Sequence, residues 1–306
     1  MKPQTTHLKH YQPPSFLITY IEVEVDIQDQ WSVVSSKVKG HRNPKSFIPN
    51  EPLILNGEDQ TLLEVKLHGR VLKEDEYQIT DEKLTIVDVV DEFCLEIISK
   101  NYPQNNKSLE GLYLSEGMYC TQCEAEGFRR ITFFPDRPDV MSLYKTKIIA
   151  CKTSFPVLLS NGHLVDAGDL RCGRHYAVWE DPFPKPSYLF ALVAGDLACV
   201  EDCFTTISGK TIALKIYVEH GEEHRCQHAM MSLKNAMAWD EKKFGLEYDL
   251  DVFMIVAVSH FNMGAMENKG LNIFNSRYVL ADMETATDAD FQRIESIIAH
   301  EYFHNW

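Results

Sequence analysis

The chain has 306 residues, a hydrophobic fraction of 44%, a charged fraction of 25% and a formal net charge of −15 at pH 7. This length permits two domains with their own cores, and the negative charge argues against nucleic acid or an anionic membrane surface as a partner. No apolar run reaches the roughly 18 residues that a membrane helix needs, and no secretory signal is visible, so we expect a cytoplasmic protein.

Short strands dominate the first two thirds of the chain. Residues 16–28 alternate between apolar and polar side chains, which predicts a half-buried strand. Similar runs occur at 31–38, 53–55, 62–67, 83–89, 94–98, 112–119, 131–134 and 141–150. An Asn-Gly pair at 161–162 predicts a hairpin over 158–165, and three prolines within 182–186 predict a stiff crossing before a strand at 189–194. This pattern favours an all-β sandwich or saddle domain.

The pattern changes after about residue 196. Strands are predicted at 212–218 and 251–258. Between them, residues 225–244 have the periodicity of a helix, and Gly245 is suited to end it. The mixture of strands and helices predicts a second domain of α/β type that begins at residue 197, and the overall fold class is therefore mainly β plus α/β.

The last seven residues, which begin at His300, read H-E-Y-F-H-N-W. Thr287 and Asp290 have the spacing of a capping box, and apolar residues then recur at steps of three and four, which predicts a helix. Imidazoles four residues apart share one helix face, so His300 and His304 can bind one zinc ion at roughly 2.0–2.1 Å. Glu301 is then placed to act on water as a general base. The alternative is two histidines that are solvated or satisfied in a core.

Two other motifs have simpler interpretations. The eight cysteines are expected to be reduced in a cytoplasmic protein. Cys120 and Cys123 form a Cys-x-x-Cys pair, but no second pair completes a zinc ribbon and no helix start follows, so two ordinary thiols are favoured. Arg129 and Arg130 could bind a phosphate, although solvated side chains or ion-pair partners are favoured.

The pentapeptide G-A-M-E-N occupies residues 264–268, between the predicted strand at 251–258 and the last helix. Together with H-E-x-x-H it resembles the zinc aminopeptidases of the aminopeptidase N family. The segments 122–132, 191–196 and 231–306 are similar to the bacterial cytosolic members, and the resemblance covers nearly all of the chain. It implies an N-terminal β-saddle domain at 1–196 and the first part of a thermolysin-like zinc peptidase domain at 197–306.

The resemblance also implies roles for single residues. His300 and His304 would be zinc ligands and Glu301 the general base. Glu124 and Glu267 would bind the free α-ammonium group of a peptide. The full set of implied substrate-binding residues is Gln122, Glu124, Met263, Gly264, Ala265, Met266, Glu267 and Asn268. Desolvated carboxylates can distinguish a chain terminus from a chain middle, because an internal amide carries no charge to pair with them.

In this family a third zinc ligand, a glutamate, and a tyrosine that stabilises the tetrahedral intermediate follow the second histidine, and both would fall beyond Trp306. We therefore expect the complete protein to be a monomeric, zinc-dependent aminopeptidase of broad specificity that acts in peptide turnover on peptides with a free N-terminus. The 306-residue chain itself is expected to be inactive. The alternatives are a zinc endopeptidase, which would not need two anchoring carboxylates, and a non-catalytic peptide- or metal-binding fragment.

Overall fold

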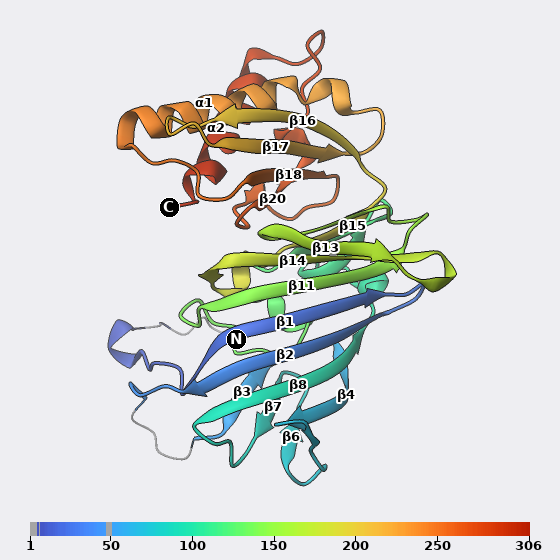
Figure 1. The fold of residues 1–306 in the computed structure, drawn as a ribbon, viewed down its shortest axis with the longest axis vertical. Helices are drawn as coiled ribbons and strands as arrows, with labels where there is room; N and C mark the ends of the chain where they lie inside the picture. The colour runs from blue at the N-terminus through green and yellow to red at the C-terminus, as the bar shows by residue number, and fades with distance from the viewer. Residues whose placement is uncertain (1–4, 6, 47–50) are drawn as a thin grey trace.

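The computed structural model describes residues 5, 7–46 and 51–306, and within them the chain forms four β-sheets and two α-helices. In Figure 1 the strands of the first two thirds of the chain fill the middle and lower part of an elongated molecule, and both helices lie at the opposite end, where the C-terminus is. None of the helices in this described part is long and apolar enough to cross a membrane. The predicted fold class, mainly β with an α/β region at the C-terminal end, is confirmed.

The largest sheet has eight strands. In spatial order they are β13 (His163–Asp169), β14 (Arg174–Lys185), β11 (Ser142–Cys151), β1 (Phe16–Ile27), β2 (Ser32–Arg42), β8 (Glu92–Asn101), β4 (Gln60–Leu67) and β5 (Arg70–Val71). Strand β1 is parallel to β11 and antiparallel to β2. Alternate side chains of β1, including Ile21, Val23 and Val25, are buried, and the residues between them are partly exposed. One face of the sheet therefore covers a core and the other faces solvent.

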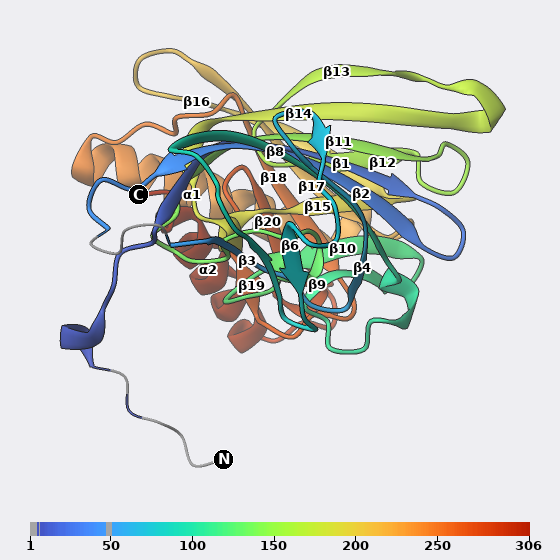
Figure 2. The ribbon, with the colours of Figure 1, turned by 90° about the horizontal axis from the view of Figure 1, so that it is seen from below.

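Two smaller sheets pack against the buried face of the large one. Their strands are β12 (Val157–Ser160), β15 (Leu192–Gly195), β10 (Met118–Gln122) and β9 (Gly111–Ser115) in one, and β3 (Leu53–Asn56), β7 (Lys83–Ile86) and β6 (Tyr77–Ile79) in the other. Their buried side chains join those of β1, β2 and β8 in one hydrophobic cluster, and Figure 2 shows both on the same side of the large sheet. Within this core Phe128 packs edge to face against Phe134, Tyr144 and Phe190, with ring centroids 5.2, 5.9 and 5.1 Å apart.

The fourth sheet and the two helices form the C-terminal region. The strands, in spatial order, are β16 (Ala198–Thr205), β17 (Thr211–Val218), β18 (Val252–Val258), β20 (Leu271–Asn275) and β19 (Ala265–Met266), and the helices are α1 (Gln227–Phe244) and α2 (Asp288–Phe303). On β18, Ile255 packs in the cluster that contains both helices, whereas Met254 and Val256 join the core of the N-terminal sheets. Both faces of β18 are thus covered, which explains its continuous apolar sequence.

The C-terminal end of α1 and the N-terminal end of α2 follow the sequence predictions. Helix α1 is followed by Gly245 in the left-handed region (φ 68°), where glycine avoids the Cβ clash of other residues. Helix α2 begins with a capping box, in which the Asp290 backbone N–H donates to Thr287 Oγ1 (3.3 Å) and the Thr287 N–H donates to Asp290 Oδ2 (3.0 Å). Short 3₁₀-helices connect other elements, at Leu8–His10, Pro103–Asn105, Phe128–Arg130, Arg171–Gly173, Ser187–Leu189, Glu223–Arg225 and Ser276–Tyr278.

The hairpin predicted over 158–165 is wrong. Strand β12 pairs with β15 and strand β13 pairs with β14, so the two strands belong to different sheets. The buried Asn161 side chain explains the difference: its Nδ2 donates to the carbonyls of Leu189 (3.1 Å) and Lys269 (2.9 Å), and its Oδ1 accepts the Ala191 N–H (2.8 Å). The Asn-Gly pair therefore passes the chain from one sheet to another instead of reversing it within one.

Three other segments differ from the predicted strands. The run at 112–119 is two strands, β9 and β10, that pair with each other across a turn at 116–117. Residues 131–134 form only an isolated bridge to β3, because their apolar side chains fill the core. The proline-rich segment predicted as a stiff crossing instead continues strand β14, which includes Pro182 and Pro184. Pairing with β13 stops at Glu180, so one edge is free there and tolerates proline.

Several strands were not predicted, among them β16, β19 and β20. Between Gly195, at the end of β15, and Ala198, at the start of β16, the chain passes from the four-stranded to the five-stranded sheet. The domain boundary at residue 196 stays a prediction.

Candidate active site

Helix α2 presents the two histidines of the motif on one side. Its opposite side is buried, with Ile294, Ile298 and Tyr302 packed in the cluster that also contains α1 and β18. The helix ends at Phe303, but its C-cap His304 keeps helical backbone angles (φ −62°, ψ −12°), so the spacing of the motif is maintained. Both imidazoles are exposed, and the Nε2 atoms of His300 and His304 lie 3.0 Å apart.

This separation fits a shared metal ion. Two nitrogens bound to a tetrahedral zinc at roughly 2.0–2.1 Å are about 3.3 Å apart, so the two imidazoles need to separate by only a few tenths of an ångström. Next to them, Glu301 is 7% exposed, and its Oε2 atom has no hydrogen-bond partner among the residues that the structure describes. A buried carboxylate oxygen without a partner is unusual in a folded protein. The donor set of two imidazoles beside a free carboxylate oxygen suits a zinc ion and a water molecule.

Three carboxylates lie close enough to influence one another. Burial, together with the negative charges of Glu267 and Glu124, raises the pKa of Glu301 to about 7. The pKa of Glu124 is also raised, first by desolvation and then by Glu267, while His304 opposes the shift. Each of these carboxylates makes the charged form of its neighbours less favourable. Groups of carboxylates with raised pKa values are typical of functional sites.

Glu267 joins the carboxylate cluster to the histidine pair. Its Oε1 lies 3.9 Å from His304 Nδ1, and ligand atoms of Glu267, Glu301 and His304 all lie within 4.8 Å of one another. Over residues 5, 7–46 and 51–306 this is the one group of three potential metal-ligating side chains. The structure therefore brings the G-A-M-E-N segment and the H-E-x-x-H helix together, as the sequence analysis expects.

The N-terminal region contributes to the same site. Gln122 is the last residue of β10 and is 2% exposed, yet within the described part of the chain neither the oxygen nor the nitrogen of its side-chain amide has a hydrogen-bond partner. Glu124 follows two residues later in an exposed position. Because Glu124 is within range of the charges of both Glu267 and His304, the loop after β10 faces the C-terminal region across the site.

The remaining predicted residues lie in and next to β19. Among the described strands, β19 pairs with β20 alone and is the last in the sheet, so its other edge is free of these strands. Gly264 directly precedes β19, and Met263 is partly exposed. The side chains of Met266 and Asn268 are buried instead; the Asn268 Nδ2 donates to the carbonyl of Phe190 (3.2 Å).

Sequence reasoning missed several residues beside the site. Lys269 directly follows G-A-M-E-N, and its ammonium group donates to Asp249 and to Asn305; its adjacency to the motif was a signal that could have been used. Tyr188 has its pKa raised by burial and then by the charges of Glu267 and Glu124, which places it near both. No spacing in the proline-rich segment around Tyr188 indicated this.

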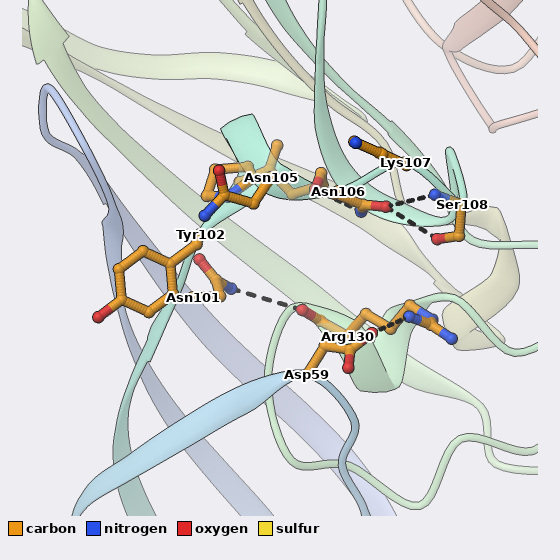
Figure 3. Close-up of a pocket in the computed structure, with 10 residues that line it drawn as sticks. Asp59, Asn101, Tyr102, Asn105, Asn106, Lys107, Ser108 and Arg130 are labelled. Atoms are coloured by element: carbon orange, nitrogen blue, oxygen red, sulfur yellow. Dashed lines mark hydrogen bonds and ion pairs between the residues drawn. The ribbon is translucent and has the colours of Figure 1, made fainter.

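Two pockets of similar volume differ in whether they contain the predicted site residues. One of about 380 Å³ is lined by Glu267, Lys269, Glu301 and His304. A second, of about 370 Å³, lies in the N-terminal region and contains none of the predicted site residues. Figure 3 shows this second pocket, with Asn101 donating to the carbonyl of Arg130.

The prediction that the two arginines have ion-pair partners is confirmed. Arg130 pairs with Glu58 (2.9 Å) and Asp59, and Arg129 pairs with Asp136 (3.1 Å), so both arginines have carboxylate partners. All eight cysteines are free, and Cys120 and Cys123 are fully buried in the core.

The fold and the site together define a class of protein. A helix presents H-E-x-x-H with the Nε2 atoms of its two imidazoles 3.0 Å apart, and a separate β region supplies polar side chains to the same place. This is the arrangement of a metallopeptidase.

Comparison with known proteins gives the family. Residues 9–189 match the Peptidase M1 N-terminal domain, and residues 228–306 match the Peptidase family M1 domain. The chain belongs to peptidase family M1.

The chain is similar to several named relatives. It is 53% identical over 304 residues to an aminopeptidase N of Caulobacter vibrioides, covering 99% of this chain and 35% of that protein. It is 52% identical over 308 residues to an aminopeptidase N of Escherichia coli, covering 100% of this chain and 34% of that protein. A crystal structure of Legionella pneumophila aminopeptidase A in complex with aspartic acid matches with a TM-score of 0.94 and 36% identity, over 98% of this chain and 35% of that one. The chain thus spans about a third of the length of these relatives.

Proposed function

We propose that the protein containing this chain is a zinc-dependent aminopeptidase that releases N-terminal residues from peptides with broad specificity. One observation carries the proposal: ligand atoms of Glu267, Glu301 and His304 converge within 4.8 Å, beside a histidine pair whose Nε2 atoms are 3.0 Å apart. The relatives named aminopeptidase N support the same activity. The free cysteines are compatible with a cytoplasmic location, which we also propose.

The histidine pair and Glu301 would carry the hydrolysis. His300 and His304 would hold the zinc ion, which supplies Lewis-acid activation of the scissile carbonyl and of the attacking water. Glu301 has a free Oε2 atom and a pKa raised to about 7 by burial and by its acidic neighbours. A carboxylate with such a pKa can accept a proton from water and then pass it to the leaving amine near neutral pH.

The other carboxylates would select a free N-terminus. Glu124 and Glu267 approach the site from opposite regions of the molecule, and each raises the pKa of Glu301 through its negative charge. A cationic α-ammonium group bound between them would relieve this repulsion, whereas an internal peptide bond would not. Binding the ammonium group there sets the first peptide bond beside Glu301. Gln122, whose amide lacks partners, is available for a further hydrogen bond.

The backbone near β19 would hold the peptide in an extended conformation. The free edge of β19 can pair with a peptide strand, and Gly264 has no side chain to prevent a close approach. Met263 is partly exposed and lies next to Gly264 in the chain, so it would line the pocket for the first side chain. Main-chain pairing makes few demands on side chains, which is consistent with broad specificity.

The proposal is tested by comparing free and N-acetylated peptides with the full-length protein and its Glu267→Gln variant. We expect the wild type to need the free amine, and Glu267→Gln to reduce kcat/KM for free peptides by about 10²-fold, because removing one partner of a desolvated charge pair costs about 2–5 kcal/mol. Glu295→Gln, an exposed position on the same helix, is the matched control. Equal cleavage of free and acetylated peptides, unchanged in Glu267→Gln, would favour an endopeptidase.

For the 306-residue chain itself we propose peptide or metal binding without turnover, because two imidazoles make a weaker site than the three ligands usual for catalytic zinc. The same assay applies to it. Peptide release by this chain that disappears in Glu301→Gln would contradict this part of the proposal.

A further inference from the structure

Lys269 makes three hydrogen bonds at the rim of the candidate site. Its Nζ donates to Asp249 Oδ1 (3.0 Å) and Oδ2 (2.8 Å) and to Asn305 Oδ1 (2.9 Å). Its side chain is 13% exposed, and the ammonium group also lies 4.5 Å from the centre of the Phe183 ring. An ammonium group has three N–H donors, so all of them are used inside the protein and none is left for a substrate.

These bonds join segments that carry different parts of the site. Lys269 is two residues after Glu267, and Asn305 directly follows His304. Asp249 lies between α1 and β18, and it accepts a further hydrogen bond from Asn305 Nδ2 (3.3 Å). The three side chains therefore form a closed triangle between the G-A-M-E-N segment and the end of α2.

The N-terminal region holds the same lysine from another side. The carbonyl of Lys269 accepts a hydrogen bond from the buried Asn161 Nδ2 (2.9 Å), and Phe183 belongs to β14. Lys269 is thus the residue at which the large sheet, the G-A-M-E-N segment and the metal-site helix are all fixed relative to one another.

The segments that this triangle joins have other contacts, since Asn268 Nδ2 donates to the carbonyl of Phe190 (3.2 Å) and Trp306 Nε1 donates to Asp240 Oδ2 (2.6 Å). Regular secondary structure, however, ends beside the functional groups. Strand β19 has only two residues, and Glu267 lies just outside it. His304 is the C-cap of α2, in the last turn, where helices fray. Glu267 Oε1 and His304 Nδ1 lie 3.9 Å apart, and a substrate that reaches both an ammonium anchor and a metal ion needs their separation to be maintained. Functional groups of this kind need supporting hydrogen bonds from a surrounding layer of residues.

We propose that Lys269 is a positioning residue of the peptidase site: through Asp249 and Asn305 it fixes the separation of Glu267 and His304. This inference rests on the proposed function and names a residue that acts on it without touching substrate. The positive charge of Lys269 is neutralised by Asp249, so the effect is one of geometry and not of attraction for the substrate.

The competing interpretation is that Lys269 and Asp249 form an ordinary stabilising ion pair. Removing it would then lower thermal stability and leave the folded enzyme unchanged. Lys269→Met keeps the length and apolar stem of the side chain and removes its three donors. Lys234→Met is the matched control, because Lys234 pairs with Asp202 (2.7 Å) in the same region, and neither residue belongs to the candidate site.

The test measures kcat and KM for free aminoacyl amides, zinc affinity by competition with a chromophoric chelator, and Tm, all on the full-length protein. We expect Lys269→Met to raise KM about tenfold or more with a smaller change in kcat, since a displacement of about 1 Å in an anchoring group can cost up to 10²-fold, and to weaken zinc binding. Lys234→Met should change neither. Asn305→Ala, which removes only the second side of the triangle, should raise KM in the same direction, and it provides the test if Lys269→Met does not fold.

A double variant separates the two interpretations further. If Lys269 acts through Asn305, then Lys269→Met and Asn305→Ala together raise KM no more than the larger single effect, because both break one network. The inference is overturned if KM and zinc affinity in both single variants match the wild type while only Tm falls, or if the KM effects multiply. A wild type that neither cleaves free aminoacyl amides nor binds zinc would overturn the proposed function itself, and the inference with it.

Discussion

The eight-stranded sheet and the candidate active site differ in how their carboxylates are paired. On the exposed face of the sheet several carboxylates pair with a cation, as in Lys37 with Glu96 (3.0 Å) and Lys147 with Glu24 (2.8 Å), and the buried face is mainly apolar. At the site Glu301 is buried beside other carboxylates with one oxygen unpaired. The ion pairs of the sheet are formed within the folded chain, whereas the Glu301 carboxylate at the site keeps an oxygen atom that a ligand can complete. Real proteins depart from local consistency in this way at functional sites.

This difference predicts opposite responses to mutation. Shortening a side chain in the core of the sheets removes packing that nothing replaces, so it destabilises the chain. Neutralising a carboxylate in the site removes repulsion and an unpaired buried charge, so it stabilises the chain at the expense of function. Three measurements on the isolated 306-residue chain, free of metal, test the comparison.

The largest effect is expected for Phe128→Ala. Phe128 is fully buried among Phe134, Tyr144 and Phe190, and large-to-small changes at such positions cost about 3–5 kcal/mol in the free energy of unfolding. Urea unfolding followed by circular dichroism measures it. Phe244→Ala is the matched control, because Phe244 is 59% exposed at the end of α1. Similar losses in both variants would show that this aromatic cluster is not the core that the structure indicates.

A smaller effect of opposite sign is expected for Glu301→Gln. The variant keeps the shape of the side chain and removes the charge that Glu267 and Glu124 repel. We expect the free energy of unfolding at neutral pH to rise by about 1 kcal/mol, the usual size of gains at destabilised active sites. Urea unfolding in the presence of a chelator gives the value, with Glu295→Gln as the control on the same helix. A loss of stability in Glu301→Gln would mean that this carboxylate has a structural role.

The same contrast explains which features the sequence predicts. The strand β1 and the helix α2 were predicted because their apolar residues repeat with the period of a strand or a helix, and a capping box marks the start of α2. Residues His300 and Glu301 were indicated by local spacing. Each of these signals depends only on residues close together in the chain, so it can be found in a single sequence.

Features that depend on distant partners were not predictable in this way. The Asn161-Gly162 pair looks like a hairpin turn, but the partners of the Asn161 side chain, the backbones of Leu189, Ala191 and Lys269, are far along the chain. The role of Lys269 depends on Asp249 and Asn305 for the same reason. Resemblance to a family indicated Glu124, which neither spacing nor composition singles out. Long-range polar contacts therefore set the limit of the sequence analysis.

The smallest effect is expected for the ion pair between Arg70 and Glu76, which is formed on the surface and is exposed to solvent. Hydrogen bonds from Arg70 and from the backbone N–H of Lys73 lower the pKa of Glu76 to about 2. Because the pKa is lowered on folding, the stability from this group is present above the ordinary value of about 4.5 and is lost as pH falls through about 2. The difference in unfolding free energy between wild type and Glu76→Gln should therefore shrink over this range, with Glu74→Gln as the exposed control. Since surface ion pairs contribute little, this change should be smaller than that of Glu301→Gln. If the difference in unfolding free energy between wild type and Glu76→Gln is the same at all pH values, Glu76 contributes through its shape and not through its charge. The contrast between paired and unpaired carboxylates would then not extend to surface ion pairs.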